Sequence, residues 1–296
     1  EVVTRILFGV MIVTSIYLLL AGHNTPGGGF AGGLVAGMAL MILGIGVLCW
    51  GLVEAPDHGW GSIRTVVAIL AGLVMLGLTF LRSRRPADRW IPTLDVDLFK
   101  ARPFAMACLT ALIFMVAFAA ILLGGVLFLT TVWGFSVLEA GIAFFPGPAM
   151  AGIFSVLGSR FGARFGTGPV AATGCGFLIL GGTWWFTRMG DTSAYFTENL
   201  PGQILVGIGV GLVLPNVAAA VASTLPPTSL ATGTAVLSAS RQVGAALGVA
   251  ILVALLGSAA VVGTADDFDK AWLMIAISAA IAGATALTIG RAGKTE

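Results

Sequence analysis

The sequence is poor in charged side chains. Only 9% of its 296 residues are Asp, Glu, Lys or Arg, and 58% are hydrophobic, whereas soluble domains carry about 25% charged residues. A water-soluble globular domain is therefore excluded. The formal net charge is +2 at pH 7, so the chain lacks a basic surface that could neutralise a row of phosphates. A nucleic-acid partner is not expected.

Residue types that carry chemistry are also scarce. The three cysteines, Cys49, Cys108 and Cys175, lie inside apolar runs without the spacing of a disulfide or zinc motif. We interpret them as small core side chains. No nucleophile, acid–base pair or metal-ligand cluster stands out in the apolar runs. The sequence therefore predicts no enzyme activity, no metal site and no cofactor.

Long apolar runs occupy most of the chain. A helix needs about 20 mainly apolar residues to cross a bilayer, and the runs are too continuous for an outer-membrane barrel. The first run lacks the pattern of a signal peptide, so we interpret it as a spanning helix of a fragment or processed chain. The predicted fold class is all-α, a polytopic membrane bundle of about nine transmembrane helices. Their approximate ranges are 2–21, 34–53, 63–81, 104–132, 138–157, 168–187, 200–224, 233–257 and 271–290.

Basic residues predict the orientation of this bundle. Lys and Arg near helix ends are retained on the cytoplasmic side, and the joint from Arg82 to Arg102 holds six of them. Placing this joint inside puts eleven of the fifteen basic residues on that side. We therefore expect a multi-pass protein of the cell membrane, with its N-terminus outside and its C-terminus in the cytoplasm. Six tryptophans fall near the predicted outer ends, where an indole prefers the interface: Trp50, Trp60, Trp133, Trp184, Trp185 and Trp272.

Ionisable side chains are rare inside the predicted spans. No Asp, Glu, Lys or His lies in the middle of a span by these boundaries, and Arg5, Glu139 and Arg241 are expected only near helix ends. Proton coupling needs a titratable group that can be reached from both sides. The chain alone is therefore not expected to be a complete proton-coupled pump.

Glycine and proline are instead concentrated in two spans. Pro146-Gly147-Pro148 is expected to break the fifth span, and the glycines of 207–212, followed by Pro215-Asn216, are expected to interrupt the seventh. Broken helices in transporters line cavities, so Pro146, Pro148, Pro215 and Asn216 are candidate cavity-lining residues. The alternative is that these small residues let neighbouring helices pack closely.

Arg241 and Gln242 are expected to open the eighth span. Gly244 and Gly248 follow at the GxxxG spacing of helix-packing faces. One interpretation places Arg241 at the cytoplasmic interface, above a helix contact made by the two glycines. The other gives Arg241 and Gln242 a gating or helix-capping role.

Six segments in order carry a resemblance to a known family. From about residue 43 to 291 the chain resembles the C-terminal part of the fourteen-helix, EmrB/QacA-type drug:proton antiporters of the major facilitator superfamily. The segments are GLVEAPDHGWGS (51–62), LDVDLFKARPFA (94–105), EAGIAFFPGPAMAG (139–152), SRFGAR (159–164), GIGVGLVLP (207–215) and GTAVLSASRQVGAALGVAI (233–251).

This resemblance implies two six-helix halves that alternate access to a central cavity, with two extra helices between them. Residues 34–81 would hold the extra helices and 104–290 the second half. Arg160, Gly162 and Arg164 resemble the superfamily's cytoplasmic loop motif, in which arginines hold helix ends together. Gly158 and Ser159 stand where that motif often has an acid. A complete member would carry six helices before residue 34, so this chain is expected to be incomplete.

The beginning of the chain resembles a different family. RILFGVMIVTSIYLLLAGHNTPGGGFAGGLVAG (5–37) is similar to the start of the B-type component of Mrp-type multisubunit sodium/proton antiporters, whose hallmark is a glycine-rich joint. The matching residues here are His23, Asn24, Pro26, Gly27, Gly28 and Gly29. A glycine-rich joint permits tight turns and exposed amides. For His23, a structural role and an ion or proton contact remain open.

Together these patterns predict three segments and three alternative functions. The segments are a helix and joint that resemble the Mrp B-type component (1–37), two linker helices with a basic loop (38–103) and a six-helix bundle (104–296). The leading hypothesis is a partial multidrug or small-molecule efflux carrier that works by alternating access, with walls such as Phe114, Phe118, Phe144 and Phe145.

The alternatives are an accessory subunit of a monovalent cation/proton antiporter and a non-transporting membrane scaffold or fragment. The expected partners are the lipid bilayer, a lipophilic substrate, a coupling proton or sodium ion, and either a second copy or a missing N-terminal half.

Overall fold

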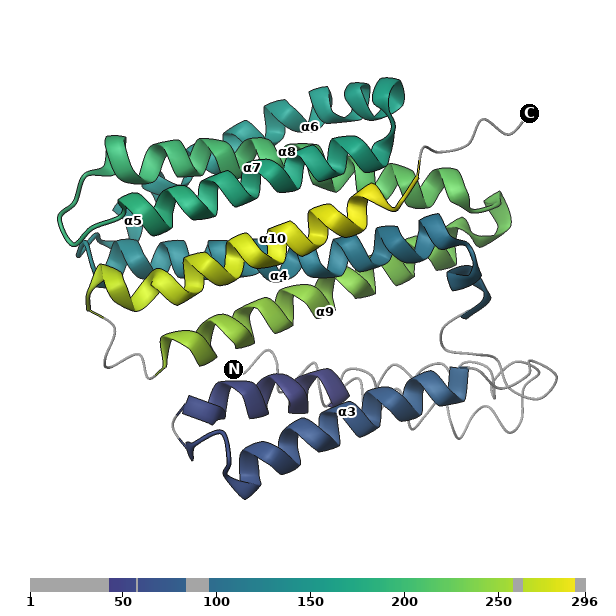
Figure 1. The fold of residues 1–296 in the computed structure, drawn as a ribbon, viewed down its shortest axis with the longest axis horizontal. Helices are drawn as coiled ribbons and strands as arrows, with labels where there is room; N and C mark the ends of the chain where they lie inside the picture. The colour runs from purple at the N-terminus through teal and green to yellow at the C-terminus, as the bar shows by residue number, and fades with distance from the viewer. Residues whose placement is uncertain (1–42, 57, 84–95, 258–262, 291–296) are drawn as a thin grey trace. The chain divides into compact units, whose positions relative to one another are not determined.

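The computed structural model describes residues 43–56, 58–83, 96–257 and 263–290 (Figure 1). These residues are helical or form turns and short connections, with no strand among them. They belong to two compact units, which divide at Gly51, Trp60 and Asp97. The first unit contains residues 43–51 and 61–97 of the described part, and the second contains residues 52–60 and those from Leu98 onward.

The first unit is built on α3, Ile63–Ser83. Residues 43–51, which belong to the helix Leu43–Pro56, pack along α3 through glycines. A Cβ on Gly72 would lie 2.8 Å from the Gly44 carbonyl oxygen, and a Cβ on Gly51 would lie 2.9 Å from the Ala68 Cβ. Because neither glycine has a side chain, the two backbones approach closely, as in small-residue faces of membrane helices.

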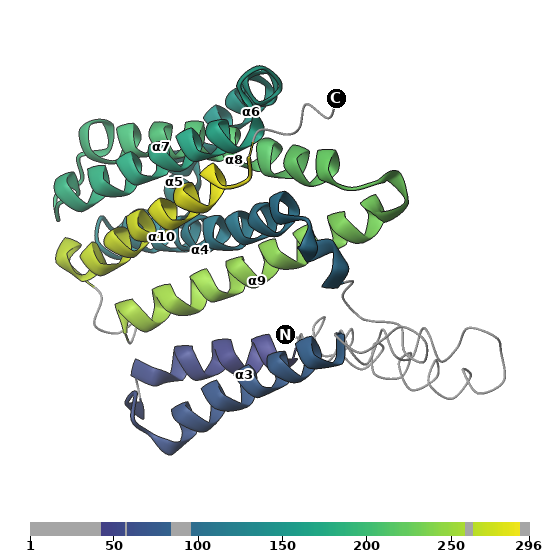
Figure 2. The same cartoon turned by 45° about the vertical axis from the view of Figure 1, so that its right-hand side comes forward.

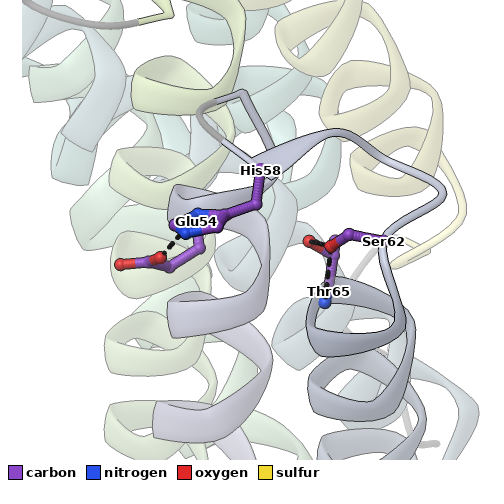
Figure 3. Close-up of polar contacts among 4 residues, drawn as sticks. All are labelled: Glu54, His58, Ser62 and Thr65. Atoms are coloured by element: carbon purple, nitrogen blue, oxygen red, sulfur yellow. Dashed lines mark hydrogen bonds and ion pairs between the residues drawn. The ribbon is translucent and has the colours of Figure 1, made fainter.

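Two local polar contacts lie at the helix ends on either side of the joint at 59–61 (Figure 3). Ser62 caps α3, because its hydroxyl accepts the Thr65 backbone N–H at 3.2 Å and donates to Thr65 Oγ1 at 2.8 Å. On the preceding segment, His58 Nδ1 lies 3.0 Å from Glu54 Oε2, one helical turn earlier. Both side chains of this pair are more than a third exposed, so the pair contributes little to stability.

Six long helical segments form the second unit. In chain order its elements are α4 (Arg102–Thr131), α5 (Val137–Phe144), α6 (Pro146–Phe165), α7 (Thr167–Arg188), the π-helical turn η2 (Tyr195–Asn199), α8 (Leu200–Thr224), η3 (Pro227–Ser229), α9 (Leu230–Leu256), η4 (Ala265–Phe268) and α10 (Asp269–Leu287). The short helix η1 (Val96–Lys100) precedes α4.

The helices of this unit pack around two central members, α4 and α8. Helix α4 contacts α9 on one side and α10 on the other, and α8 lies between α6 and α7 (Figures 1 and 2). Helix α10 also contacts α7, which joins the α4 group to the α8 group. Accordingly, the most apolar stretch of each central helix is more than half buried, 56% in α4 and 61% in α8. The corresponding stretches of α5–α6 and α9 are only 17% and 22% buried.

Six helical segments of the described chain are long and apolar enough to span a membrane. They coincide with the last six predicted spans, and the helices Leu43–Pro56 and Ile63–Leu78 fall in two earlier ones. The helical membrane bundle is therefore confirmed, whereas the first predicted span, 2–21, lies outside the described residues. The count of nine stays a prediction.

The helix boundaries correct two predictions, the break in the seventh span and the position of Arg241 in the eighth. Helix α8 runs without interruption from Leu200 to Thr224 and keeps Pro215 inside it, so 207–216 does not break the helix. Helix α9 begins at Leu230, which places Arg241 about three turns inside the helix rather than at its opening. By contrast, the fifth span does divide, into α5 and α6 at Phe145, because Pro146 has no N–H to continue the helix.

An aromatic cluster fills one end of the second unit. The Phe128 ring lies 5.1 Å from that of Phe268, and the Trp185 ring lies 5.1 Å from that of Trp272. Trp185 and Trp272 are each 1% exposed. The preference of indoles for the membrane interface therefore does not explain these two tryptophans, which pack inside the protein. Trp50 and Trp60 are more than half exposed.

Candidate functional site

A cavity of about 220 Å³ lies among α4, α5, α6 and α8. We call it the Gln203 cavity. Helix α4 supplies three lining residues, α5 and α6 supply four, and α8 supplies four. The lining residues are Phe118, Ile121, Leu122, Phe144, Gly147, Pro148, Ala151, Gln203, Val206, Gly207 and Val210.

Two aromatic rings form walls of this cavity, and each is held by a neighbour. Phe144 packs against α4 at Gly125, where an added Cβ would clash with its ring. Phe118 stacks on Phe114 with ring centroids 5.9 Å apart and planes 14° apart. Of the four phenylalanines predicted as cavity walls, Phe118 and Phe144 line it, Phe114 is fully buried behind Phe118, and Phe145 is 69% exposed outside it.

Gln203 is the polar side chain of the cavity. It lies in the first turn of α8 and is 1% exposed, yet its Nε2 has no hydrogen-bond partner among the described residues. Its Oε1 lies against α6, 2.6 Å from the position that a Cβ on Gly147 would occupy. An unpaired buried amide costs about 1–3 kcal/mol, so such a group calls for an explanation. Gln203 was not among the predicted site residues; the available signal was an amide near the start of a largely apolar span that also holds Asn216.

Asn216 joins α8 to α6 at the other end of these helices. Its Nδ2 donates to the Gly158 carbonyl oxygen at 2.9 Å and to the Leu212 carbonyl oxygen at 2.8 Å. Its Oδ1 lies against Gly162, where an added Cβ would clash with it. Asn216 and Pro215 were predicted to line a cavity, but neither lines the Gln203 cavity or the cavity beside α6, α7 and α8. Asn216 instead connects two helices.

The predicted proline residues of α6 lie at the start of that helix. Pro148 lines the Gln203 cavity, whereas Pro146 does not. Pro146 occupies the first position of α6, where its missing N–H costs no hydrogen bond.

A capping box begins helix α5. Ser136 Oγ accepts the Glu139 N–H at 3.3 Å, and Glu139 Oε2 accepts the Ser136 N–H at 2.8 Å.

The predicted loop and gating residues occupy different environments. Arg160 and Arg164 are exposed on the last turns of α6, and the Arg164 guanidinium lies 5.3 Å from the Phe165 ring centroid. Arg241 is half-buried in the interior of α9, and Gln242 beside it is exposed. Arg241 forms no ion pair with a carboxylate of the described residues. An unpaired cation in an apolar helix is costly, which makes it a functional candidate.

Gly244 and Gly248 bring α9 against α4. A Cβ on Gly244 would clash with the Leu112 carbonyl oxygen, and a Cβ on Gly248 would lie 2.8 Å from the Val116 Cα. At these two positions the backbones of α9 and α4 therefore approach closely.

A second, more open cavity of about 390 Å³ lies on the side of α6, α7 and α8. Its walls are mostly aromatic and aliphatic and include Phe161 and Phe165, next to Arg164. The glycine-rich joint with His23, Asn24, Pro26, Gly27, Gly28 and Gly29 lies outside the described residues. In the described part of the chain, no group of three or more His, Cys, Asp or Glu side chains could hold a metal ion.

Comparison with known proteins gives two kinds of match. Residues 1–91 match the family described as "Domain related to MnhB subunit of Na+/H+ antiporter". The resemblance at the beginning of the chain therefore extends beyond residue 37 and covers the described helices of the first unit.

Most of the chain is similar to drug-resistance and export proteins. It is 27% identical over 224 residues to multidrug resistance protein Stp of Mycobacterium tuberculosis, covering 76% of this chain and 41% of the relative. It is 28% identical over 253 residues to the tetracenomycin C resistance and export protein of Streptomyces glaucescens, covering 80% and 43%. It is 24% identical over 250 residues to lincomycin resistance protein LmrB of Listeria innocua, covering 83% and 52%.

The chain thus spans about half the length of the curated relatives it matches. The alignment with LmrB covers 83% of the chain, which is more than residues 92–296 can supply. It therefore extends into residues 1–91, the region matched by the MnhB-related family. These relatives and the six helices long and apolar enough to span a membrane support a multi-pass membrane protein. The relatives are named as resistance and export proteins and not as enzymes.

Proposed function

We propose that this chain is the second half of a carrier that exports small lipophilic molecules across the cell membrane by alternating access. The observation that carries the proposal is the similarity of over three quarters of the chain to resistance and export proteins. The apolar Gln203 cavity supports it, because ligand sites in helical bundles lie between helices and are mostly apolar with few polar groups.

The carrier needs a second half, supplied either by a second copy of this chain or by a separate N-terminal half. Helices α5–α6 and α9 flank the two central helices, yet only 17% and 22% of their most apolar stretches are buried. These sparsely buried helices provide the surface for such a partner, and lipid covers the remainder. In the orientation proposed from the basic residues, the N-terminus lies outside and the C-terminus lies in the cytoplasm.

Two groups of residues are proposed to act in the movement between states. Arg241 is a cation in the interior of α9 that can respond to a negative charge on the partner half. A coupling proton or sodium ion would bind to an acid of that half, because a guanidinium neither accepts a cation nor releases its proton. Arg160, Gly162 and Arg164 lie at the end of α6, where α6 meets Asn216. This end of the helix serves as a cytoplasmic clamp that opens and closes.

Reconstituted vesicles test the proposal. The full chain is incorporated into lipid vesicles, and the movement of ethidium, a fluorescent lipophilic cation, is compared with that in empty vesicles. We expect protein-dependent movement that Arg241→Ala impairs at least tenfold. Arg188→Ala is the matched control, because Arg188 is also a helical arginine but lies at the end of α7 against the Trp184 ring. Transport no faster than in empty vesicles would favour a non-transporting scaffold.

A second candidate function is supported by the match of residues 1–91 to the MnhB-related family. On this alternative, the chain is an accessory subunit of a multisubunit monovalent cation/proton antiporter. It should then co-purify from its native membrane with other membrane subunits, and His23→Ala should loosen that complex. A chain that migrates in mild detergent only with a second copy of itself contradicts this alternative without affecting the export hypothesis, which allows a second copy as the partner.

A further inference from the structure

The open cavity of about 390 Å³ on the side of α6, α7 and α8 offers a hydrocarbon environment. We call it the α6–α7 groove. Eight of its nine lining residues are apolar. The ninth, Thr173, donates its hydroxyl to the Pro169 carbonyl oxygen of its own helix at 2.9 Å. The lining side chains therefore offer a ligand no free hydrogen-bond donor, which suits an alkyl chain and disfavours a polar molecule.

The α6–α7 groove extends from one end of its helices into the membrane. Phe165 is the last residue of α6 and Thr167 is the first of α7, so the turn between them lies at one membrane surface. Phe177 lines the groove ten residues after Thr167, which is about 15 Å along a helix. The hydrocarbon core of a bilayer is about 30 Å thick. The lining therefore extends over the depth of one leaflet, which is the depth of a phospholipid acyl chain.

The groove opens toward the outside of the second unit. Phe161 and Phe165 are 42% and 54% exposed, whereas Leu212 of α8 is only 5% exposed. Residues of α6 and α7 therefore form the walls, and α8 forms the floor. Apolar side chains on the outside of a membrane bundle contact lipid tails, so an acyl chain can enter the groove sideways from the bilayer.

Two arginines lie at the surface end of the groove. Arg160 and Arg164 are one helical turn apart on α6 and therefore share a face. The Arg164 guanidinium lies 5.3 Å from the ring centroid of Phe165, a lining residue. Neither arginine forms an ion pair with a carboxylate of the described residues, and the sequence has no Asp or Glu between Glu139 and Asp191. An anion at this end would face two cations and no acid of α6 or α7.

We infer that the α6–α7 groove holds an acyl chain of an anionic phospholipid, whose phosphate pairs with Arg164 and Arg160. Guanidinium groups match the geometry of a phosphate. A zwitterionic phospholipid has the same chains, but its cationic headgroup would bring a positive charge toward the two arginines. This inference goes beyond the proposed function, because lipid binding is measured without transport. A chain that retains such a lipid but moves no ethidium would refute export and leave this site intact.

Competition between two lipids tests the headgroup contact. The full chain in mild detergent receives equal amounts of phosphatidylglycerol and phosphatidylcholine with identical acyl chains, and native mass spectrometry counts the lipids that stay bound. We expect the wild-type chain to retain phosphatidylglycerol about tenfold over phosphatidylcholine. In Arg160→Gln/Arg164→Gln the ratio should fall to about one. Arg188→Gln is the matched control and should keep the preference, because Arg188 lies against the Trp184 ring at the opposite end of α7.

A second variant tests the groove itself. Thr173 is an exposed lining residue, so Thr173→Trp should fill the groove without disturbing buried packing and should reduce the retention of both lipids about tenfold. Leu180→Trp is the matched control, since Leu180 is an exposed residue of α7 that does not line the groove. Glycerol phosphate carries the phosphate without the chains, so it should not displace the bound lipid.

Several results would overturn the inference. Equal retention of the two lipids by the wild-type chain is one, and a preference that survives in the double arginine variant, or that Arg188→Gln also abolishes, is another. Displacement by glycerol phosphate would show an anion site that does not use the groove. If the double arginine variant does not fold, Thr173→Trp decides: unchanged lipid retention contradicts the site, and loss of a dimer in place of a lipid shows that a second copy covers the groove.

Discussion

The contact between α9 and α4 permits a quantitative test with a single methyl group. In Gly248→Ala the new Cβ would lie 2.8 Å from the Val116 Cα and 2.9 Å from the Val116 carbonyl carbon. Both are backbone atoms of α4, so no side chain can rotate away and the helices must separate. Overpacking of this kind costs about 1–3 kcal/mol. For a unit of this size we expect the melting temperature to fall by about 3–9 °C.

The same substitution at Gly176 is the control for helix propensity. Gly176 lies inside α7, and no atom stands within 4 Å of the position of an added Cβ. Alanine stabilises a helix interior by about 0.5–1 kcal/mol relative to glycine, so Gly176→Ala should leave the melting temperature unchanged or raise it slightly. Thermal unfolding in mild detergent, followed by the fluorescence of the buried Trp185 and Trp272, measures both variants. A Gly248→Ala variant as stable as Gly176→Ala would refute the close approach of α9 to α4.

Two further predictions concern polar contacts within the second unit. Asn216→Ala removes the hydrogen bonds to the Gly158 and Leu212 carbonyl oxygens and should cost about 1–3 kcal/mol; an unchanged melting temperature would contradict this connection between α6 and α8. Ser136→Ala removes the capping box of α5 and should cost about 1 kcal/mol, whereas Ser155→Ala, whose hydroxyl bonds only the Gly152 carbonyl oxygen of its own helix, should cost little. Equal losses in the two serine variants would show that the cap contributes nothing.

The positions of the long helices could be predicted because their signal is local. A run of about 20 apolar residues is helical in a membrane whatever its neighbours are, since its backbone must satisfy its own hydrogen bonds. Helices α4, α7 and α8 therefore begin and end within a few residues of the predicted spans. The Pro146 break was predictable for the same reason, because proline removes a hydrogen-bond donor within its own helix.

Features that depend on neighbouring helices could not be predicted. The tryptophans were predicted at the interface because they fall near span ends, but Trp185 is buried by partners from another part of the chain, such as Trp272. Arg241 was predicted to open the eighth span, yet the structure extends α9 back to Leu230. The amide of Gln203 in a largely apolar span was a weak signal, because its burial depends on the packing of α6 at Gly147.

Gly158 illustrates how packing explains a departure from a family pattern. The cytoplasmic loop motif that SRFGAR resembles often has an acid near this position, and this chain has glycine. A Cβ on Gly158 would lie 2.8 Å from the Gly211 carbonyl oxygen and 3.1 Å from the Leu212 Cα, so no larger side chain fits between α6 and α8. The Gly211 carbonyl oxygen also lacks a hydrogen-bond donor within its own helix, because Pro215, four residues later, has no N–H. The polar connection is instead made by Asn216, whose amide reaches the Gly158 carbonyl oxygen across the gap that the glycine leaves open. Arg160 and Arg164 consequently lie on the same end of α6 as an uncharged connection between the two helices.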